Sequence, residues 1–174
     1  MAALNVSKLG NPVLRKPSEA VPKEAISSKA FQRLLDNMVD TMRACEGVGI
    51  AAPQVGVSKQ AAVIEVKRDA RMEQPIPLTV LINPRITAAA STTLEDWEGC
   101  LSVNDLRGRV PRAAWVEVEM LNRKGEKVRF RAEGFFARVV QHECDHLAGR
   151  VFLDRMPNLL TLSHLEEFAR FCEE

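Results

Sequence analysis

The chain carries two histidines four residues apart in the segment Gln141-His142-Glu143-Cys144-Asp145-His146. In an α-helix, residues four apart lie one above the other, so His142 and His146 can face a single metal ion. The carboxylate of Glu143 would then lie to one side of that ion, where it could exchange protons with a water molecule. The segment therefore predicts a helix that carries the metal site of a hydrolase.

The flanking residues favour a helix that is partly buried. Gly134 and Gly149 stand at its expected ends, where glycine commonly bounds a helix. Phe135 and Val139 recur at helical spacing with the two histidines and fall on the same stripe. We therefore expect an apolar pocket beside the metal, lined by Phe135 and Val139.

The third metal ligand distinguishes several classes of metalloprotein. A metzincin would need a histidine at position 152, which is Phe152, so this class is excluded. A gluzincin-like endopeptidase would use Glu166 or Glu167 as a downstream ligand. Residues 159–168, however, read as a terminal amphipathic helix that turns both acids, and also His164, toward solvent. The residues of that helix expected to face the protein are Leu162, Leu165 and either Phe168 or Ala169.

An upstream cysteine is the other candidate for the third ligand. It lies in the segment Glu98-Gly99-Cys100-Leu101-Ser102, where the flanking glycine can let the thiolate come close to a metal. A thiolate from Cys100 together with two imidazoles would leave one tetrahedral position for water. From the residues alone, the choice between Cys100 and a downstream glutamate stays open.

Four segments, taken in this order, resemble the peptide deformylase family. They are Leu9-Gly10-Asn11-Pro12-Val13-Leu14-Arg15, Gly47-Val48-Gly49-Ile50-Ala51-Ala52-Pro53-Gln54, and residues 98–102 and 141–147. Their combination and spacing are far more specific than any one of them. The resemblance spans residues 4–157 and leaves the terminal helix outside.

The resemblance implies a metal-dependent hydrolase. Cys100, His142 and His146 would hold the metal. Glu143 would act as general base and general acid. The reaction would hydrolyse the formyl amide on the N-terminal methionine of newly made polypeptides and release formate. Ferrous iron would be the physiological ion, while zinc, nickel or cobalt could bind the same single thiolate and two imidazoles.

The resemblance also implies how the substrate is held. The side-chain amide of Gln54 and the backbone N–H of Leu101 would stabilise the negative charge that develops on the formyl oxygen. Gly49 would hydrogen-bond the peptide backbone, and Arg107 would lie at the pocket entrance. The full set of expected substrate contacts is Gly47, Val48, Gly49, Arg107, Phe135 and Val139.

Three other residues of the metal-binding segment are expected to lie away from the metal. Gln141 and Asp145 could orient the ligands from behind, although Asp145 could equally be a surface acid. Cys144 lies roughly opposite His142 on the helix and is expected to pack against the core.

The composition limits the partners and the compartment. Lys and Arg number 24 against 23 acids, so no charge excess points to nucleic acid or an anionic membrane. No apolar run reaches the length of a membrane span, and residues 1–6 show no secretory leader. The four cysteines fit a reducing, bacterial-type cytoplasm. Ribosome contact would suit the implied task, but the acidic pair Glu173-Glu174 gives it no support.

Periodicity along the chain predicts an α+β fold. Apolar residues recur with helical period from Phe31 to Met42, after Ser27-Ser28, and predict an N-terminal helix. Strands are predicted over residues 61–66, 78–83, 85–88, 114–121 and 127–133, the last two joined in a hairpin, with a loop or strand end over residues 88–93. We expect one domain over residues 1–174, in which antiparallel strands surround a central metal-binding helix, with an N-terminal and a C-terminal helix.

Two rival functions remain open at this point. A gluzincin-like metallo-endopeptidase would need Glu166 or Glu167 on the metal and would leave Cys100 dispensable. A catalytically inactive, metal-stabilised binding module would keep the metal and hydrolyse nothing.

Overall fold

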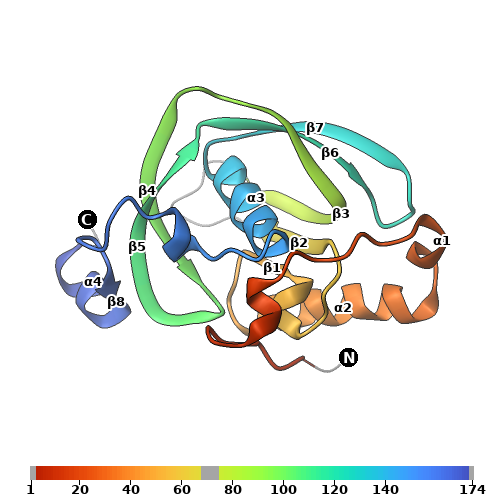
Figure 1. Cartoon of the computed structure of the whole chain (residues 1–174), viewed down its shortest axis with the longest axis horizontal. Helices are drawn as coiled ribbons and strands as arrows, with labels where there is room; N and C mark the ends of the chain where they lie inside the picture. Colours follow the sequence, from red (N-terminus) through yellow and green to blue (C-terminus); the bar gives the residue numbers. More distant parts are fainter. Residues whose placement is uncertain (1–2, 68–74, 173–174) are drawn as a thin grey trace.

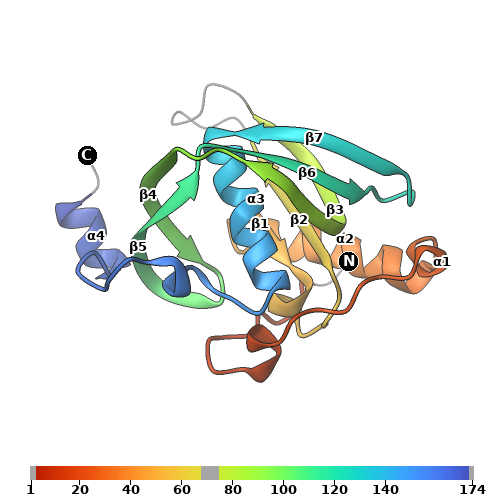
Figure 2. The same cartoon turned by 45° about the horizontal axis from the view of Figure 1, so that its top comes forward.

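Two antiparallel sheets surround one central helix in the computed structural model, which describes residues 3–67 and 75–172. Figures 1 and 2 show this helix, α3 (Gly134–Leu147), between the sheets. One sheet has five strands in the order β1-β2-β3-β6-β7, and the other has three in the order β4-β5-β8. The predicted α+β class is confirmed.

The five-stranded sheet contains the predicted hairpin. Its strands are β1 (Gly49–Ala51), β2 (Ala61–Val66), β3 (Ile76–Ala89), β6 (Trp115–Leu121) and β7 (Lys127–Glu133). In the turn between β6 and β7, Asn122 Oδ1 accepts hydrogen bonds from the backbone N–H groups of Lys124 (2.9 Å) and Glu126 (3.0 Å). Gly125 supplies the φ of 78° that the turn requires.

The prediction of separate strands over residues 78–83 and 85–88 is wrong, because both lie in the single strand β3. Asn83 interrupts the ladder with a φ of 50°. Its side chain accepts a hydrogen bond from the N–H of Val21 (2.8 Å) and donates one to the carbonyl of Val21 (2.9 Å). A contact distant in sequence therefore stabilises a kink within one continuous strand.

The three-stranded sheet was not predicted. It consists of β4 (Thr93–Cys100), β5 (Val103–Ala113) and β8 (Ser163–His164). Charged residues are frequent in β4 and β5, so neither strand shows a clean alternation of apolar and polar residues. Residues 88–93, expected as a loop or strand end, contain the end of β3, a short connection and the start of β4.

The prediction of a helix over residues 159–168 is confirmed only from Leu165 onward and is wrong for residues 159–164. The chain turns after residue 159, forms β8, and enters helix α4 (Leu165–Phe171) only afterwards. β8 pairs with Leu106 and Arg107 of β5. Backbone hydrogen bonds to β5 thus replace the first turns of the expected helix. The acidic pair Glu173-Glu174 lies outside the described residues.

The predicted N-terminal helix is α2 (Lys29–Ala44), which follows the single turn α1 (Lys23–Ile26). Ser28 caps α2 by accepting a hydrogen bond from the N–H of Phe31 (3.2 Å). Short 3-10 turns complete the connections: η1 (Pro12–Arg15), η2 (Ala52–Val55) and η3 (Phe152–Arg155). Among the described residues, no helix is long and apolar enough to cross a membrane.

Alternation along β2 divides the core into two layers. Val63 packs with Leu35 and Met38 of α2 on one face of the sheet. Ile64 packs with Val139 of α3 on the other face. Helix α3 is therefore enclosed between the two sheets, which explains how a helix with several polar residues stays buried.

We expect Leu35→Ala to lower the free energy of unfolding by about 2–5 kcal/mol, because it removes a fully buried side chain and leaves a cavity beneath α2. Leu160→Ala serves as the control, since Leu160 is 92% exposed and should change the value by less than about 0.5 kcal/mol. Urea denaturation of both variants measures the difference. Equal losses would contradict this description of the core.

Candidate metal centre and active site

The structure brings the three expected metal ligands together. Helix α3 carries His142 and His146 on one face, and Cys100 stands at the end of β4 beside them. Cys100 Sγ lies 3.3 Å from His146 Nε2, and the two Nε2 atoms lie 3.2 Å apart. All three ligand atoms fall within 4.8 Å of one another.

The chemistry of these donors fits a divalent metal ion. A thiolate and two imidazole nitrogens direct lone pairs into one enclosed space, where a cation would offset their mutual repulsion. Burial lowers the pKa of His146 and favours the neutral ring that a metal needs. Its Nδ1 is buried without a hydrogen-bond partner among the described residues.

A buried carboxylate, Glu98, holds His142 in place. Glu98 Oε2 accepts a hydrogen bond from His142 Nδ1 (2.9 Å), which leaves Nε2 of that ring directed at the other ligands. Arg112 donates to both oxygens of Glu98 (2.9 and 3.0 Å), and Arg138 donates to Oε1 (2.8 Å). Burial raises the pKa of Glu98, but the bonds to His142 and Arg112 outweigh it and lower the pKa to about 2.

Asp145 extends this network away from the metal. It accepts hydrogen bonds from Arg112 (2.5 Å) and Arg155 (2.6 Å), and it is only 5% exposed. The interpretation of Asp145 as a surface acid is therefore wrong. The side chain of Gln141 accepts a hydrogen bond from the N–H of Ala113 and donates one to its carbonyl (3.0 Å each), so it joins α3 to the end of β5.

Glu143 lies in the cavity with one oxygen free. It is 3% exposed, and its Oε2 has no hydrogen-bond partner among the described residues. Burial raises the pKa of Glu143 to about 7, while positive charge on His142 acts in the opposite direction. The backbone of Gly49 passes so close that a Cβ there would lie 2.3 Å from Glu143 Oε1. Only glycine therefore fits at position 49 without displacing the carboxylate.

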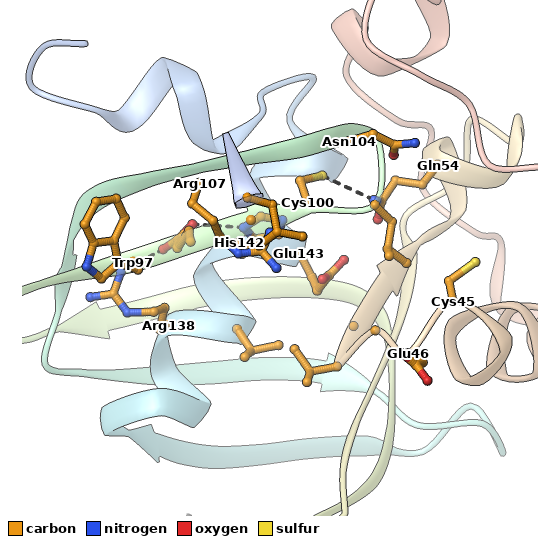
Figure 3. Close-up of a pocket in the computed structure, with 18 of the residues that line it drawn as sticks. Cys45, Glu46, Gln54, Trp97, Cys100, Asn104, Arg107, Arg138, His142 and Glu143 are labelled. Atoms are coloured by element: carbon orange, nitrogen blue, oxygen red, sulfur yellow. Dashed lines mark hydrogen bonds and ion pairs between the residues drawn. The ribbon is translucent and has the colours of Figure 1, made fainter. Parts of the chain in front are cut away.

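The side chain of Gln54 is aimed by its own backbone. Its Oε1 accepts a hydrogen bond from the N–H of Ala51 (2.8 Å), which turns Nε2 toward Cys100 Sγ (3.5 Å) and Ser102 Oγ (3.3 Å). The amide donor therefore points at the ligand cluster, as Figure 3 shows. Leu101 follows Cys100 directly and lines the same cavity.

The N-terminal segment ties these two parts of the site together. The N–H of Ser7 donates to the carbonyl of Gln54 (2.7 Å), and the N–H of Leu9 donates to the carbonyl of Ser102 (2.8 Å). Lys8 Nζ donates to the carbonyl of Leu101 (2.9 Å). The segment before η1 thus bonds to the backbone at Gln54 and to the backbone at Leu101 and Ser102. It fixes the distance between these two parts of the site.

The cavity around the ligands has a volume of about 520 Å³. It includes the expected contacts Gly47, Val48, Gly49, Arg107, Phe135 and Val139. Val48 and Phe135 keep 38% and 40% of their surface exposed, so they stand at its open side. The lining residues that the sequence did not identify include Trp97, Arg138 and Leu165. Trp97 precedes the cysteine motif directly, but its sequence position alone does not show which way the ring points.

The downstream acids lie apart from the ligand cluster. Glu166 and Glu167 are both on α4, where each pairs with Arg170 (3.1 and 3.2 Å). They are exposed, as the sequence predicted. Neither belongs to the group formed by Cys100 and the two histidines, so the gluzincin-like arrangement receives no support from the geometry.

Comparison with known proteins links this chain to one family over most of its length. The family model described as polypeptide deformylase matches residues 3–161. Peptide deformylase 2 of Pseudomonas putida is 40% identical over 93% of this chain and 92% of that protein. The peptide deformylase of Halothermothrix orenii is 47% identical over 90% of this chain and 95% of that protein.

Solved structures agree with the sequence comparison. A peptide deformylase of Acinetobacter baumannii with bound Met-Ala-Ser has a TM-score of 0.85 and 39% identity, covering 89% of this chain and 99% of that one. The enzyme of Thermotoga maritima has a TM-score of 0.79 and 34% identity, covering 91% and 100%. The chain therefore belongs to the peptide deformylase family, the metal-dependent hydrolases that remove the N-formyl group from newly made polypeptides.

Proposed function

We propose that this chain deformylates N-formylmethionyl peptides at the cluster formed by Cys100, His142 and His146. The observation that carries the proposal is the meeting of three ligand atoms within 4.8 Å of one another beside the buried carboxylate of Glu143, whose Oε2 has no hydrogen-bond partner among the described residues. The whole chain, residues 1–174, acts as one catalytic domain. Ferrous iron is the proposed physiological ion, with zinc, nickel or cobalt as other occupants of the same ligands.

Each reacting proton has a place in this geometry. A divalent ion at the cluster would supply a Lewis acid that lowers the pKa of the attacking water. Glu143 Oε2 accepts the proton that this water loses as its oxygen bonds to the formyl carbon. Glu143 then delivers that proton to the methionine nitrogen as the C–N bond breaks, and formate leaves.

Two donors stabilise the negative charge on the formyl oxygen. Gln54 Nε2 is already turned toward the ligand cluster by the bond from Ala51 to Oε1. The backbone N–H of Leu101 is the second donor. Both are uncharged, so they act without adding a titrating group, and loss of one such donor typically costs about 3–4 kcal/mol of transition-state stabilisation.

The apolar part of the cavity selects the first residue. Val48, Phe135 and Val139 surround a space for an unbranched apolar side chain, which favours methionine over glycine or aspartate. Gly49 offers its backbone to the peptide, and Arg107 lies at the mouth. The Acinetobacter baumannii enzyme was solved with bound Met-Ala-Ser, a peptide that begins with methionine, which supports a peptide substrate of this kind.

The proposed setting follows from the substrate. Formylmethionyl chains begin at the ribosome, so we propose that the protein acts in a bacterial-type cytoplasm on emerging chains. No direct contact with nucleic acid or membrane is proposed, because the chain carries 24 basic and 23 acidic residues.

The decisive experiment is an assay of the anaerobically purified protein on a formyl-Met-Ala-Ser peptide. Release of formate together with one new amine per peptide would establish the activity. Metal binding without any release would instead show an inactive binding module, and cleavage of an internal peptide bond would show an endopeptidase.

Glu143→Gln should retain the metal and the fold but reduce hydrolysis by about 10²–10⁴, because the amide cannot accept a proton. Cys144→Ser is the neighbouring control, since Cys144 packs against the core behind the ligands and should leave metal content and turnover largely unchanged. Metal stoichiometry and single-turnover rates on the same preparations separate the two effects. Wild-type turnover in Glu143→Gln would exclude it as the base.

Cys100→Ala should strongly reduce metal content, because it removes one of three ligand atoms from the cluster. Glu166→Ala and Glu167→Ala should keep full metal content, since both acids pair with Arg170 on α4. Elemental analysis after dialysis measures all three. Full occupancy in Cys100→Ala would overturn the assigned ligand set.

Arg112→Met should destabilise the metal-free protein by about 3–5 kcal/mol, because Glu98 and Asp145 would stay buried with fewer positive partners. We also expect metal affinity to fall by about 10–100-fold through the loosened His142. Arg129→Met is the matched control, since Arg129 pairs with Glu119 at the surface and should cost less than about 1 kcal/mol. Urea denaturation measures the free energy of unfolding, and metal titration measures the affinity. Equal results for the two variants would contradict the role given to Arg112.

A further inference from the structure

One peptide unit beside the ligand cluster is held at both of its ends. Its carbonyl, that of Leu101, accepts a hydrogen bond from Lys8 Nζ (2.9 Å). Its N–H, that of Ser102, donates to Cys100 Sγ (3.4 Å). The carbonyl and the N–H of a peptide unit are conjugated, so a charge bound to the oxygen polarises the N–H. The positive charge of Lys8 is therefore linked to the sulfur of a proposed metal ligand through a single peptide unit.

Lys8 is an exposed residue, but its side chain is fixed at this position by more than one contact. Nζ also donates to Asn104 Oδ1 (2.8 Å), so two of its three donor hydrogens are bound to residues that follow Cys100. The N–H of Leu9 donates to the carbonyl of Ser102 (2.8 Å). Two consecutive residues of the N-terminal segment thus bind two consecutive carbonyls after the cysteine, which keeps the ammonium in place.

The sulfur at the other end of this chain of bonds is buried. Cys100 is 9% exposed, and electrostatic interactions are stronger in such a place than in water. Gln54 Nε2 also lies 3.5 Å from the sulfur, but we assign that amide to the formyl oxygen of the substrate. The N–H of Ser102 is then the donor that stays on the sulfur during the reaction. Hydrogen bonds to a ligating sulfur reduce the charge that it donates to a metal, and proteins use them to tune metal sites.

We propose that Lys8 is a positioning residue that acts on Cys100 through the peptide unit between Leu101 and Ser102. Its charge polarises this unit and strengthens the N–H···S hydrogen bond, which limits the charge that the sulfur donates to the bound ion. The same contact holds the loop whose Leu101 N–H we assign to the formyl oxygen. The proposal rests on the proposed metal site of the deformylase, but its test does not depend on hydrolysis.

A purely mechanical anchor would make a different prediction. In that case Lys8 would only hold the loop after Cys100, and its bond to Asn104 would matter as much as its bond to Leu101. Removing the Asn104 side chain would then disturb the sulfur as much as removing Lys8. If the charge acts through the peptide unit instead, Asn104→Ala should have little effect, because the bond from Lys8 to the carbonyl of Leu101 remains.

The test uses the protein loaded with cobalt(II), in which the sulfur-to-cobalt charge-transfer band reports how readily the sulfur gives up an electron. Lys8→Met should shift this band to longer wavelength, because a sulfur with a weaker hydrogen bond is easier to oxidise. Lys8→Gln, which also removes the charge, should shift it in the same direction. Lys8→Arg keeps a positive donor and should leave the band at the wild-type position. Lys16→Met is the matched control and should also leave it there, since Lys16 is another exposed lysine of the N-terminal segment.

The amide proton of Ser102 gives a second readout by NMR of the zinc-loaded protein. Its resonance should move upfield in Lys8→Met, as the hydrogen bond to sulfur weakens, and should stay in place in Lys8→Arg and Lys16→Met. An unchanged band or an unchanged Ser102 resonance in Lys8→Met would overturn the proposal while leaving the metal site intact. An equal shift in Asn104→Ala would overturn it in favour of the mechanical anchor. Absence of any sulfur-to-cobalt band in the wild type would overturn the ligand set on which the proposed function itself rests.

Discussion

The carboxylate of Glu98 connects the elements that build the site. It stands on β4, and it binds Arg112 of β5 together with Arg138 and His142 of α3. Removing a carboxylate from water costs several kcal/mol, and the cost is recovered only when nearly every acceptor position is filled. The three donors therefore have to be present together. Their geometry fixes the position of α3 against the three-stranded sheet, and with it the distance between Cys100 and the two histidines.

The same constraint explains the crowding on the other side of the ligands. Because α3 cannot move away from β4, Glu143 projects toward β1, where the backbone of Gly49 leaves no room for a Cβ. Gln54 follows β1 after one short turn and is oriented by Ala51. The position of the proton-transferring group thus follows from interactions on the opposite face of the helix. The proposed catalytic residues are therefore held by a combination of packing against Gly49 and hydrogen bonds such as that from Ala51 to Gln54.

The sequence predicted those features that depend on local patterns. Helices α2 and α3 carry their own apolar periodicity, and the hairpin after Leu121 carries its own turn residues, so each is recognisable in isolation. The ligand set required the family resemblance, because spacing alone could not choose between Cys100 and a downstream acid. Neither the local patterns nor the family resemblance showed that Asp145 is buried. Its partner Arg112 is 33 residues away, and such ion pairs depend on a packing that no local pattern encodes.

In the C-terminal segment, the sequence predicted inward-facing side chains correctly but placed the start of the helix too early. The three-residue spacing of Leu162, Leu165 and Phe168 suggested a continuous helix with these residues facing the protein. The edge of β5 offered unpaired backbone groups to the same segment, and an isolated helical turn is only marginally stable, so Ser163 and His164 pair with β5. The helix consequently begins at Leu165, yet Phe168 still reaches Trp97 and Leu165 still faces the cavity. Apolar contacts selected which side chains turn inward, while the free strand edge determined the backbone that carries them.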